Sequence, residues 1–285
     1  LTKANSLNAI AENGCNIVGV LAGGLLYSLV GIKIILLFNG ISFIVSGISE
    51  MFIDVSSSFK TNKSLKRLNN ETIKIFIREI FDGMSYLKTQ RGLYVLFLFA
   101  IGLNFLLAPL STIFLPYIFN QLLKTNLMYL SYVNVSIAAG YIFGAAGISL
   151  LQTPNTFYKR VTGGIVGEGI LLLSISIPLF PTILSKLSAM QITIYYIFVA
   201  FLFGLVISVV NTSLGVVFQK TVDDDFRGRV SSLLSMLALA AMPFGYLFGG
   251  ILVEAFSIHM VILITSIILI TLSICMCSNK HLKEL

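Results

Sequence analysis

Long uninterrupted runs of apolar residues dominate this chain. Each run holds about 20 residues or more, which is enough for an α-helix to cross the roughly 30 Å hydrocarbon core of a bilayer. The runs lack the alternation of apolar and polar positions that marks a strand of a membrane barrel. The pattern predicts an all-α, polytopic membrane protein with eight spans, over residues 6–28, 32–53, 93–118, 128–152, 161–181, 190–218, 231–253 and 258–277.

Two segments of the chain, 3–50 and 229–276, share one pattern. They align without a gap at a separation of 226 positions. The matched residues include three pairs of glycines: Gly19 with Gly245, Gly23 with Gly249, and Gly24 with Gly250. A repeat of this length, built from membrane spans, is typical of a transporter assembled from two related halves.

The repeat also predicts how the chain is divided. The repeat partner of the span that begins near residue 93 would lie before residue 1, so about 130 residues of a first half would precede this sequence. We therefore expect an N-terminally truncated sequence whose missing helices are its partners, and a monomer when complete. Residues 1–53 would be the last two helices of the first half-bundle, 54–92 a linker with an amphipathic helix, and 93–285 a complete six-helix second half-bundle.

Composition and charge agree with a membrane location. Apolar residues make up 56% of the chain and charged residues 11%, with a mean hydropathy of +0.94, which excludes an ordinary soluble domain. The net charge is +7. Threading the spans through a membrane places all the basic residues on one side except Lys33, Lys124 and Lys186. This asymmetry predicts a plasma-membrane protein with both termini in the cytoplasm, and it explains the charge without a nucleic-acid partner.

Cysteine and histidine do not indicate a metal site or a disulfide framework. The three cysteines lie in or at the ends of apolar spans, and the two histidines have no companions at ligand spacing. An intramembrane enzyme would need a cluster of His, Asp and Glu or a Ser-His pair at membrane depth, and the sequence offers neither. We expect a protein that is not an enzyme and that holds no cofactor.

A helix with one apolar face is predicted to begin at Asn70 or Glu71. Its apolar residues recur at helical spacing: Ile73, Phe76, Ile77, Ile80, Phe81, Met84 and Leu87. Bases such as Lys74, Arg78 and Lys88 lie between them. The pattern predicts a helix on the inner membrane surface, with its bases near anionic headgroups.

Ionisable residues inside the spans are functional candidates, because a charge in a bilayer costs about 3 kcal/mol or more. Glu12 shares one helical face with three asparagines, and Glu168 lies within the span 161–181. Either carboxyl could carry a proton. The alternative is that these polar groups only satisfy one another and a neighbouring helix.

Four stretches resemble major facilitator superfamily exporters of the macrolide-efflux and enterobactin-exporter type. They are FDGMSYLKTQRGL at 81–93, LNFLLAPL at 103–110, FRGRVSS at 226–232 and AMPFGYLFGG at 241–250. The resemblance implies a bacterial secondary transporter that exports hydrophobic small molecules, such as macrolides or a secreted metabolite, by alternating access and with a proton gradient as the driving force. A fragment without transport activity and an importer of the same superfamily are the alternatives.

The glycines of the repeat are similar to a motif of drug/proton antiporters. In the first copy these are Gly14, Gly19, Gly23 and Gly24, and in the second Gly245, Gly249 and Gly250. Val20 stands where the family usually has proline. Glycines at this spacing let helix backbones approach closely, so a packing role and a coupling role both stay open.

The resemblance also indicates where substrate and gates would be. It implies a cavity lined by the spans that hold Asn104 and Asn211 with Gln219, with Tyr141 as an aromatic contact. Hydrogen bonds between helices would explain the amides as well. Asp225, Arg227 and Arg229 are candidates for closing the cytoplasmic side. Pro109 and Pro116 should bend the outer half of their span.

Overall fold

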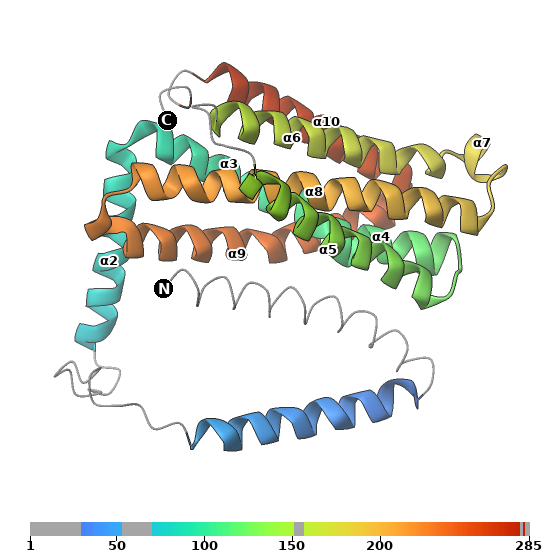
Figure 1. Ribbon diagram of the computed structural model, residues 1–285, viewed down its shortest axis with the longest axis horizontal. Helices are drawn as coiled ribbons and strands as arrows, with labels where there is room; N and C mark the ends of the chain where they lie inside the picture. The colour runs from blue at the N-terminus through green and yellow to red at the C-terminus, as the bar shows by residue number, and fades with distance from the viewer. Residues whose placement is uncertain (1–29, 53–69, 151–156, 280–281, 283–285) are drawn as a thin grey trace.

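The computed structural model describes residues 30–52, 70–150, 157–279 and 282, and over these residues the ordered elements are all helices (Figure 1). Within this part of the chain, seven helices are long and apolar enough to cross a membrane: Val30–Glu50, Arg91–Leu122, Leu127–Ile148, Tyr158–Leu179, Ala189–Thr221, Phe226–Ala255 and Ile258–Ser278. The predicted all-α polytopic fold is confirmed, and seven predicted spans match within a few residues. The eighth, 6–28, lies outside the described residues.

The helices of the main bundle run side by side with alternating direction (Figure 1). They are α3 (Arg91–Pro109), α5 (Leu127–Leu150), α6 (Phe157–Ser176), α8 (Ala189–Thr221), α9 (Asp224–Ala255) and α10 (Ile258–Ser278). Helix α8 packs against α5 and α6, α6 packs against α10, and α3 packs against α9. Helix α6 is followed by short turns, η4 (Ile177–Leu179) and α7 (Pro181–Leu184), at the opposite end of the bundle from α2.

Two helices stand outside this arrangement. Helix α2 (Asn70–Thr89) crosses one end of the bundle at a steep angle to the other helices (Figure 1). The helix Val30–Glu50 lies apart from the bundle, and no residue of its most apolar stretch is buried. The division of the chain at 53 and 92 therefore stays a prediction.

The bases of the bundle gather at the end crossed by α2. Arg91 begins α3, Lys159 and Arg160 lie in the first turn of α6, and Lys220 lies in the last turn of α8. Arg227 and Arg229 lie in the first two turns of α9. At the opposite end, among the described residues of the bundle, are Lys124 and Lys186. The asymmetry read from the sequence is therefore present in space, while the side of the membrane that it faces stays a prediction.

The span that begins with α3 changes its winding after Pro109. A π-helical segment η2 (Leu110–Phe114) follows, then α4 (Leu115–Tyr117) and a second π-helical segment η3 (Ile118–Leu122). Proline has no backbone N–H and removes one helical hydrogen bond, and the looser turns accommodate that loss. The irregular winding therefore lies where the two prolines predicted a bend.

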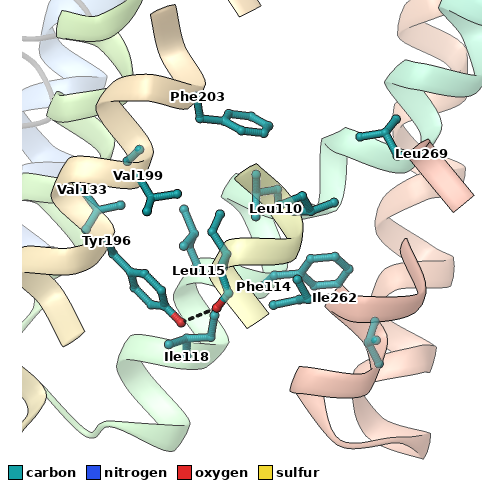
Figure 2. Packing of buried hydrophobic residues seen from close by; sticks show 14 of the residues in the cluster. Leu110, Phe114, Leu115, Ile118, Val133, Tyr196, Val199, Phe203, Ile262 and Leu269 are labelled. Carbon is teal, nitrogen blue, oxygen red and sulfur yellow. Dashed lines mark hydrogen bonds between the residues drawn. The ribbon is translucent and has the colours of Figure 1, made fainter. Parts of the chain in front are cut away.

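The irregularly wound segment 110–122 contributes several residues to the hydrophobic core. Leu110, Phe114, Leu115, Ile118 and Phe119 are all buried there. Figure 2 shows Leu115 and Ile118 beside Tyr196 of α8, whose hydroxyl donates a hydrogen bond of 2.9 Å to the carbonyl of Ile175. The tyrosine hydroxyl is thus satisfied inside an otherwise apolar region.

Helices α5 and α8 touch backbone to backbone. A Cβ atom placed on Gly140 would overlap the carbonyl oxygen of Phe201, and one placed on Gly204 would overlap the carbonyl oxygen of Ile137. A Cβ on Gly144 would lie 2.6 Å from the carbonyl oxygen of Leu205. Such contacts need small residues, since any side chain would hold the helices apart.

Because α5 contacts α8 at Gly140 but not at Gly147, substitution of these two glycines of α5 should have very different effects on thermal stability. Gly140→Ala should lower the midpoint of thermal unfolding in detergent, because the added methyl group meets a backbone carbonyl and overpacking of this kind costs about 1–3 kcal/mol. Gly147→Ala is the matched control, since no atom lies within 4 Å of the added methyl group. Equal melting of the two variants would show that this contact is not tight in the protein.

Candidate functional site

An open groove lies between α3 and α9. It has a volume of about 520 Å³, within the usual range of ligand pockets. The residues that line it are all apolar: Ile101, Gly102, Phe105, Leu237, Ala240, Ala241, Phe244 and Phe248. Gly102 and Ala240 lie in the middle third of the spans Arg91–Leu122 and Phe226–Ala255. The groove is therefore at the depth of the membrane interior.

Small residues and aromatic rings shape this groove. Gly102 on α3, together with Ala240 and Ala241 on α9, leaves space between the helices. The rings of Phe105 and Phe248 meet edge to face at a centroid distance of 5.7 Å across it. Aromatic walls without charge suit a hydrophobic or aromatic ligand.

The two helices that form the groove are held close by Gly245. A Cβ on this residue would overlap the carbonyl oxygen of Phe105. Pro109 lies four residues after Phe105 and has no N–H to bond that carbonyl, so the carbonyl is open to the approaching helix. A Cβ on Gly249 would lie 2.7 Å from the side chain of Pro109, and one on Gly250 would be 3.9 Å from Ile113.

The glycine motif predicted from the repeat is thus divided between two parts of the chain. Gly245 and Gly249 lie at the crossing of α9 with α3, where small residues are needed. Gly14, Gly19, Gly23 and Gly24 lie outside the described residues. The antiporter-like role of the motif stays a prediction.

The four residues predicted to line a cavity do not line this groove. The side-chain amide of Asn104 donates to the carbonyl of Ala100 in its own helix at 2.9 Å. Asn211 and Gln219 are exposed on α8, and Tyr141 is half-buried beside the glycine contact of α5 with α8. A role in substrate binding for these four residues stays a prediction.

The residues that line the groove were not predicted as site residues, because they are apolar like most residues of a membrane span. Leu237, Ala240, Ala241, Phe244 and Phe248 recur at helical spacing, which would have indicated one face of a helix. In a membrane span, however, lipid-facing and partner-facing positions are both apolar. Only the packing of α3 against α9 distinguishes them.

Glu168 is a carboxyl group in the interior of the bundle. It is 3% exposed and lies at the midpoint of the span Tyr158–Leu179. It shares a helical face with Ile165, Leu172 and Ile175, which are all in the core. The glycines beside it are in contact with two helices, since Gly167 lies against Val206 of α8 and Gly169 against Ile270 of α10.

Glu168 differs from most other buried polar groups of the described bundle. Thr162, Thr193, Thr265 and Ser273 each donate a hydroxyl hydrogen bond to a backbone carbonyl four residues earlier. A carboxylate has no hydrogen to donate in this way, and the N–H groups inside a helix are already bonded. A carboxyl group at this depth is costly when ionised and is a functional candidate by default. Glu12, the other predicted proton carrier, lies outside the described residues.

The end of the bundle crossed by α2 contains the predicted gate residues. Arg227 donates hydrogen bonds from Nη2 to the carbonyls of Gln219 at 2.9 Å and Val222 at 3.3 Å. These carbonyls belong to the end of α8, where helical partners are missing. Arg229 lies over the ring of Phe226 at 5.7 Å. Asp225 lies in the first turn of α9, and its side chain falls outside what the structure describes.

A tyrosine of α2 fastens this helix to the start of α9. The hydroxyl of Tyr86 donates to Oδ2 of Asp223 and accepts from the N–H of Asp223, each at 3.1 Å. Its ring stacks on Phe226 with centroids 4.4 Å apart. Buried Gly83 lies against the backbone of Arg229. This contact could not be predicted from the sequence, because the partners are 137 residues apart.

The structure shows how part of the apolar face of α2 is covered, while the placement of this helix on the inner membrane surface stays a prediction. Ile80, Met84 and Leu87 of that face pack into a cluster with residues of α3, α8 and α9, and the side chains of Ile73, Phe76 and Ile77 lie outside what the structure describes. Phe81 is 68% exposed and points away from the cluster. The face is divided because a helix that crosses the end of a bundle can bury one stripe against protein and leave the next stripe free.

Among known proteins, this chain is similar to bacterial membrane transporters. Macrolide efflux protein A of Streptococcus pyogenes is 22% identical over 274 residues, which is 96% of this chain and 63% of that protein. Multidrug efflux pump Tap of Mycolicibacterium fortuitum is 23% identical over all of this chain and 65% of its own length. Uncharacterized MFS-type transporter YvqJ of Bacillus subtilis is 23% identical over 92% of this chain and 58% of its own length.

These likenesses confirm the resemblance to major facilitator superfamily proteins of the efflux type. The chain spans 63% of the length of the Streptococcus relative, and the match covers almost all of the chain. Neither a family model nor a solved structure matches. Together with the seven described membrane-competent helices, the relatives support a multi-pass bacterial membrane protein.

The two arginines at the start of α9 should differ in their contribution to stability. Arg227→Ala removes two hydrogen bonds from the last carbonyls of α8 and should cost about 1–2 kcal/mol. Arg229→Ala removes an exposed contact with an aromatic ring, worth about 0.5–1 kcal/mol. Thermal unfolding in detergent measures both variants. A larger loss for Arg229→Ala would contradict this account of Arg227.

Proposed function

We propose that this chain belongs to a secondary active transporter that exports hydrophobic small molecules by alternating access, with a proton gradient as the driving force. The observation that carries the proposal is the open apolar groove between α3 and α9, at membrane depth, in a chain similar to macrolide efflux proteins. The chain covers part of those relatives, so the proposal concerns the activity of the complete protein.

The groove supports binding of a bulky apolar compound. Its aromatic side chains, Phe105, Phe244 and Phe248, offer large contact surfaces and no charge. A compound that partitions into the bilayer can reach a site at this depth. Binding of macrolide-like compounds is therefore the substrate class that we propose for this surface.

The rewound part of the α3 span offers a place where the helix can change shape. Its π-helical turns follow Pro109 and lie at the crossing with α9. Irregular turns of this kind have fewer regular hydrogen bonds to break than a continuous α-helix. We propose that movement of α3 relative to α9 at this point opens and closes the groove.

Glu168 is the candidate for proton coupling in the described bundle. It lies at the midplane between α8 and α10, so a change in its charge would alter the packing of both helices. A carboxyl that binds a proton on one side of the membrane and releases it on the other can drive export without a cofactor. Glu12 is the second candidate, on the basis of the sequence alone.

Filling the groove should reduce export. Ala240→Phe places a large ring in the groove, and we expect accumulation assays with a macrolide to show at least about a 10-fold loss of efflux, since a misplaced bulky group in an apolar site costs 1–3 kcal/mol. Leu239→Phe is the matched control because Leu239 is exposed on the same helix and does not line the groove. Equal efflux by the two variants at equal expression would remove the groove from the substrate path.

Glu168→Gln should uncouple export from the proton gradient. The substitution keeps the size of the side chain and removes its ability to ionise, so macrolide uptake into inverted vesicles should no longer respond to an imposed pH gradient. Glu254→Gln, at the exposed end of α9, should respond as the original protein does. If Glu168→Gln keeps the full response, the carboxyl is not the coupling group, and Glu12→Gln becomes the decisive variant.

A further inference from the structure

A second open pocket lies at the corner between α2 and α3. It has a volume of about 440 Å³ and is lined by Lys88, Arg91, Tyr94 and Val95. Lys88 is in the last turn of α2 and Arg91 is the first residue of α3. As far as the structure describes this wall, two bases line it and no acidic residue does. The predicted gate and the α3/α9 groove do not involve this pocket.

The pocket changes from polar to apolar along α3. Arg91, Val95 and Leu98 follow one face of this helix at helical spacing, and Leu98 is 50% exposed. A rise of about 1.5 Å per residue places Leu98 roughly 10 Å deeper than Arg91. A ligand that fills this surface would therefore need a charged head and an apolar tail.

The charge of the pocket is not neutralised by the start of α3. Gln90 precedes this helix and makes no side-chain hydrogen bond to its first N–H groups, and the first turn holds no acidic residue. The positive end of the α3 dipole and the two bases therefore favour the same sign of ligand charge. Arginine and lysine together are suited to bind a phosphate group.

The orientation of α2 fixes the pocket at the surface of the membrane. This helix crosses the end of the bundle (Figure 1) and is held there by Tyr86 and by the cluster around Leu87. The residues that follow it enter the membrane as α3. The pocket thus lies where headgroups meet the hydrocarbon layer, on the side of the bundle that is rich in bases.

We infer that this pocket is a binding site for an anionic phospholipid. Lys88 and Arg91 bind the phosphate of the headgroup, Tyr94 lines the headgroup region, and an acyl chain follows Val95 and Leu98 down α3. By this placement the lipid would also touch the joint between α2 and α3, and so strengthen the attachment of α2 to the bundle.

A tryptophan reporter tests this site directly. The chain contains no tryptophan, and Leu98→Trp places one beside the pocket at a position that tolerates exposure. Brominated phosphatidylglycerol in vesicles should quench this reporter at a lower mole fraction than brominated phosphatidylcholine. Lys88→Gln with Arg91→Gln should weaken the preference by about 5-fold per base, roughly 25-fold in all, which corresponds to about 1 kcal/mol for each base near a membrane surface.

Three controls make the result decisive. Lys124→Gln with Lys186→Gln removes two exposed bases from the opposite end of the bundle and should keep the preference, as should the charge-conserving pair Lys88→Arg and Arg91→Lys. Soluble glycerol 1-phosphate should not displace the lipid. Equal quenching by the two lipids, a preference that survives removal of Lys88 and Arg91, an equal loss in the distant pair, or displacement by glycerol 1-phosphate would each overturn the lipid site.

Discussion

Helices inside a bilayer gain little from burying apolar side chains against each other, because lipid is equally apolar. The bundle depends instead on places where backbones touch. Gly140 and Gly204 bring α5 and α8 together, and Gly245 brings α9 onto the Phe105 carbonyl of α3. In each case the partner atom is a backbone carbonyl. These close contacts fix the distance between α5 and α8 and the distance between α3 and α9.

Proline and glycine act together at the crossing of α3 with α9. Pro109 leaves the carbonyl of Phe105 without its helical partner and is followed by looser turns, and Gly245 allows α9 to approach that carbonyl. The same crossing lies beside the apolar groove, which Phe105 also lines, and the residues that follow Pro109 belong to the core (Figure 2). One irregularity in a helix therefore shapes both the core and the candidate binding surface.

The polar groups of the described bundle are of three kinds: those that form hydrogen bonds within their own helix, Glu168 at the midplane, and those that join helices at the end of the bundle. Thr162, Thr265 and Ser273 are buried and bond to carbonyls of their own helices, so these hydroxyls add little to the contacts between helices. Glu168 is different, because an ionised carboxylate cannot donate a hydrogen bond to a carbonyl of its own helix, and because it lies at the midplane of its span. At the end of the bundle, Tyr86 and Arg227 use hydrogen bonds to join α2, α8 and α9.

Four features could be predicted from the amino-acid sequence: the number and limits of the described spans, the start of α2, the position of the irregular turns after Pro109, and the resemblance to efflux transporters. These features follow from apolar length, helical spacing and the chemistry of proline, which are local properties. The sequence also identified Glu168 as a carboxyl at membrane depth. That Gly140 and Gly204 bring the backbones of α5 and α8 together is known only from the packing of the helices, although the spacing of Gly140 and Gly144 was visible in the sequence.

Tertiary structure also decided which apolar residues line the α3/α9 groove, that Ile80 and Leu87 face protein while Phe81 is free, and that Tyr86 meets Asp223. The physical reason is that a bilayer removes the contrast between inside and outside that patterns a soluble helix. When both faces of a helix are apolar, the sequence predicts that the helix crosses the membrane. Which face contacts a neighbouring helix becomes known only from the packing of the two backbones.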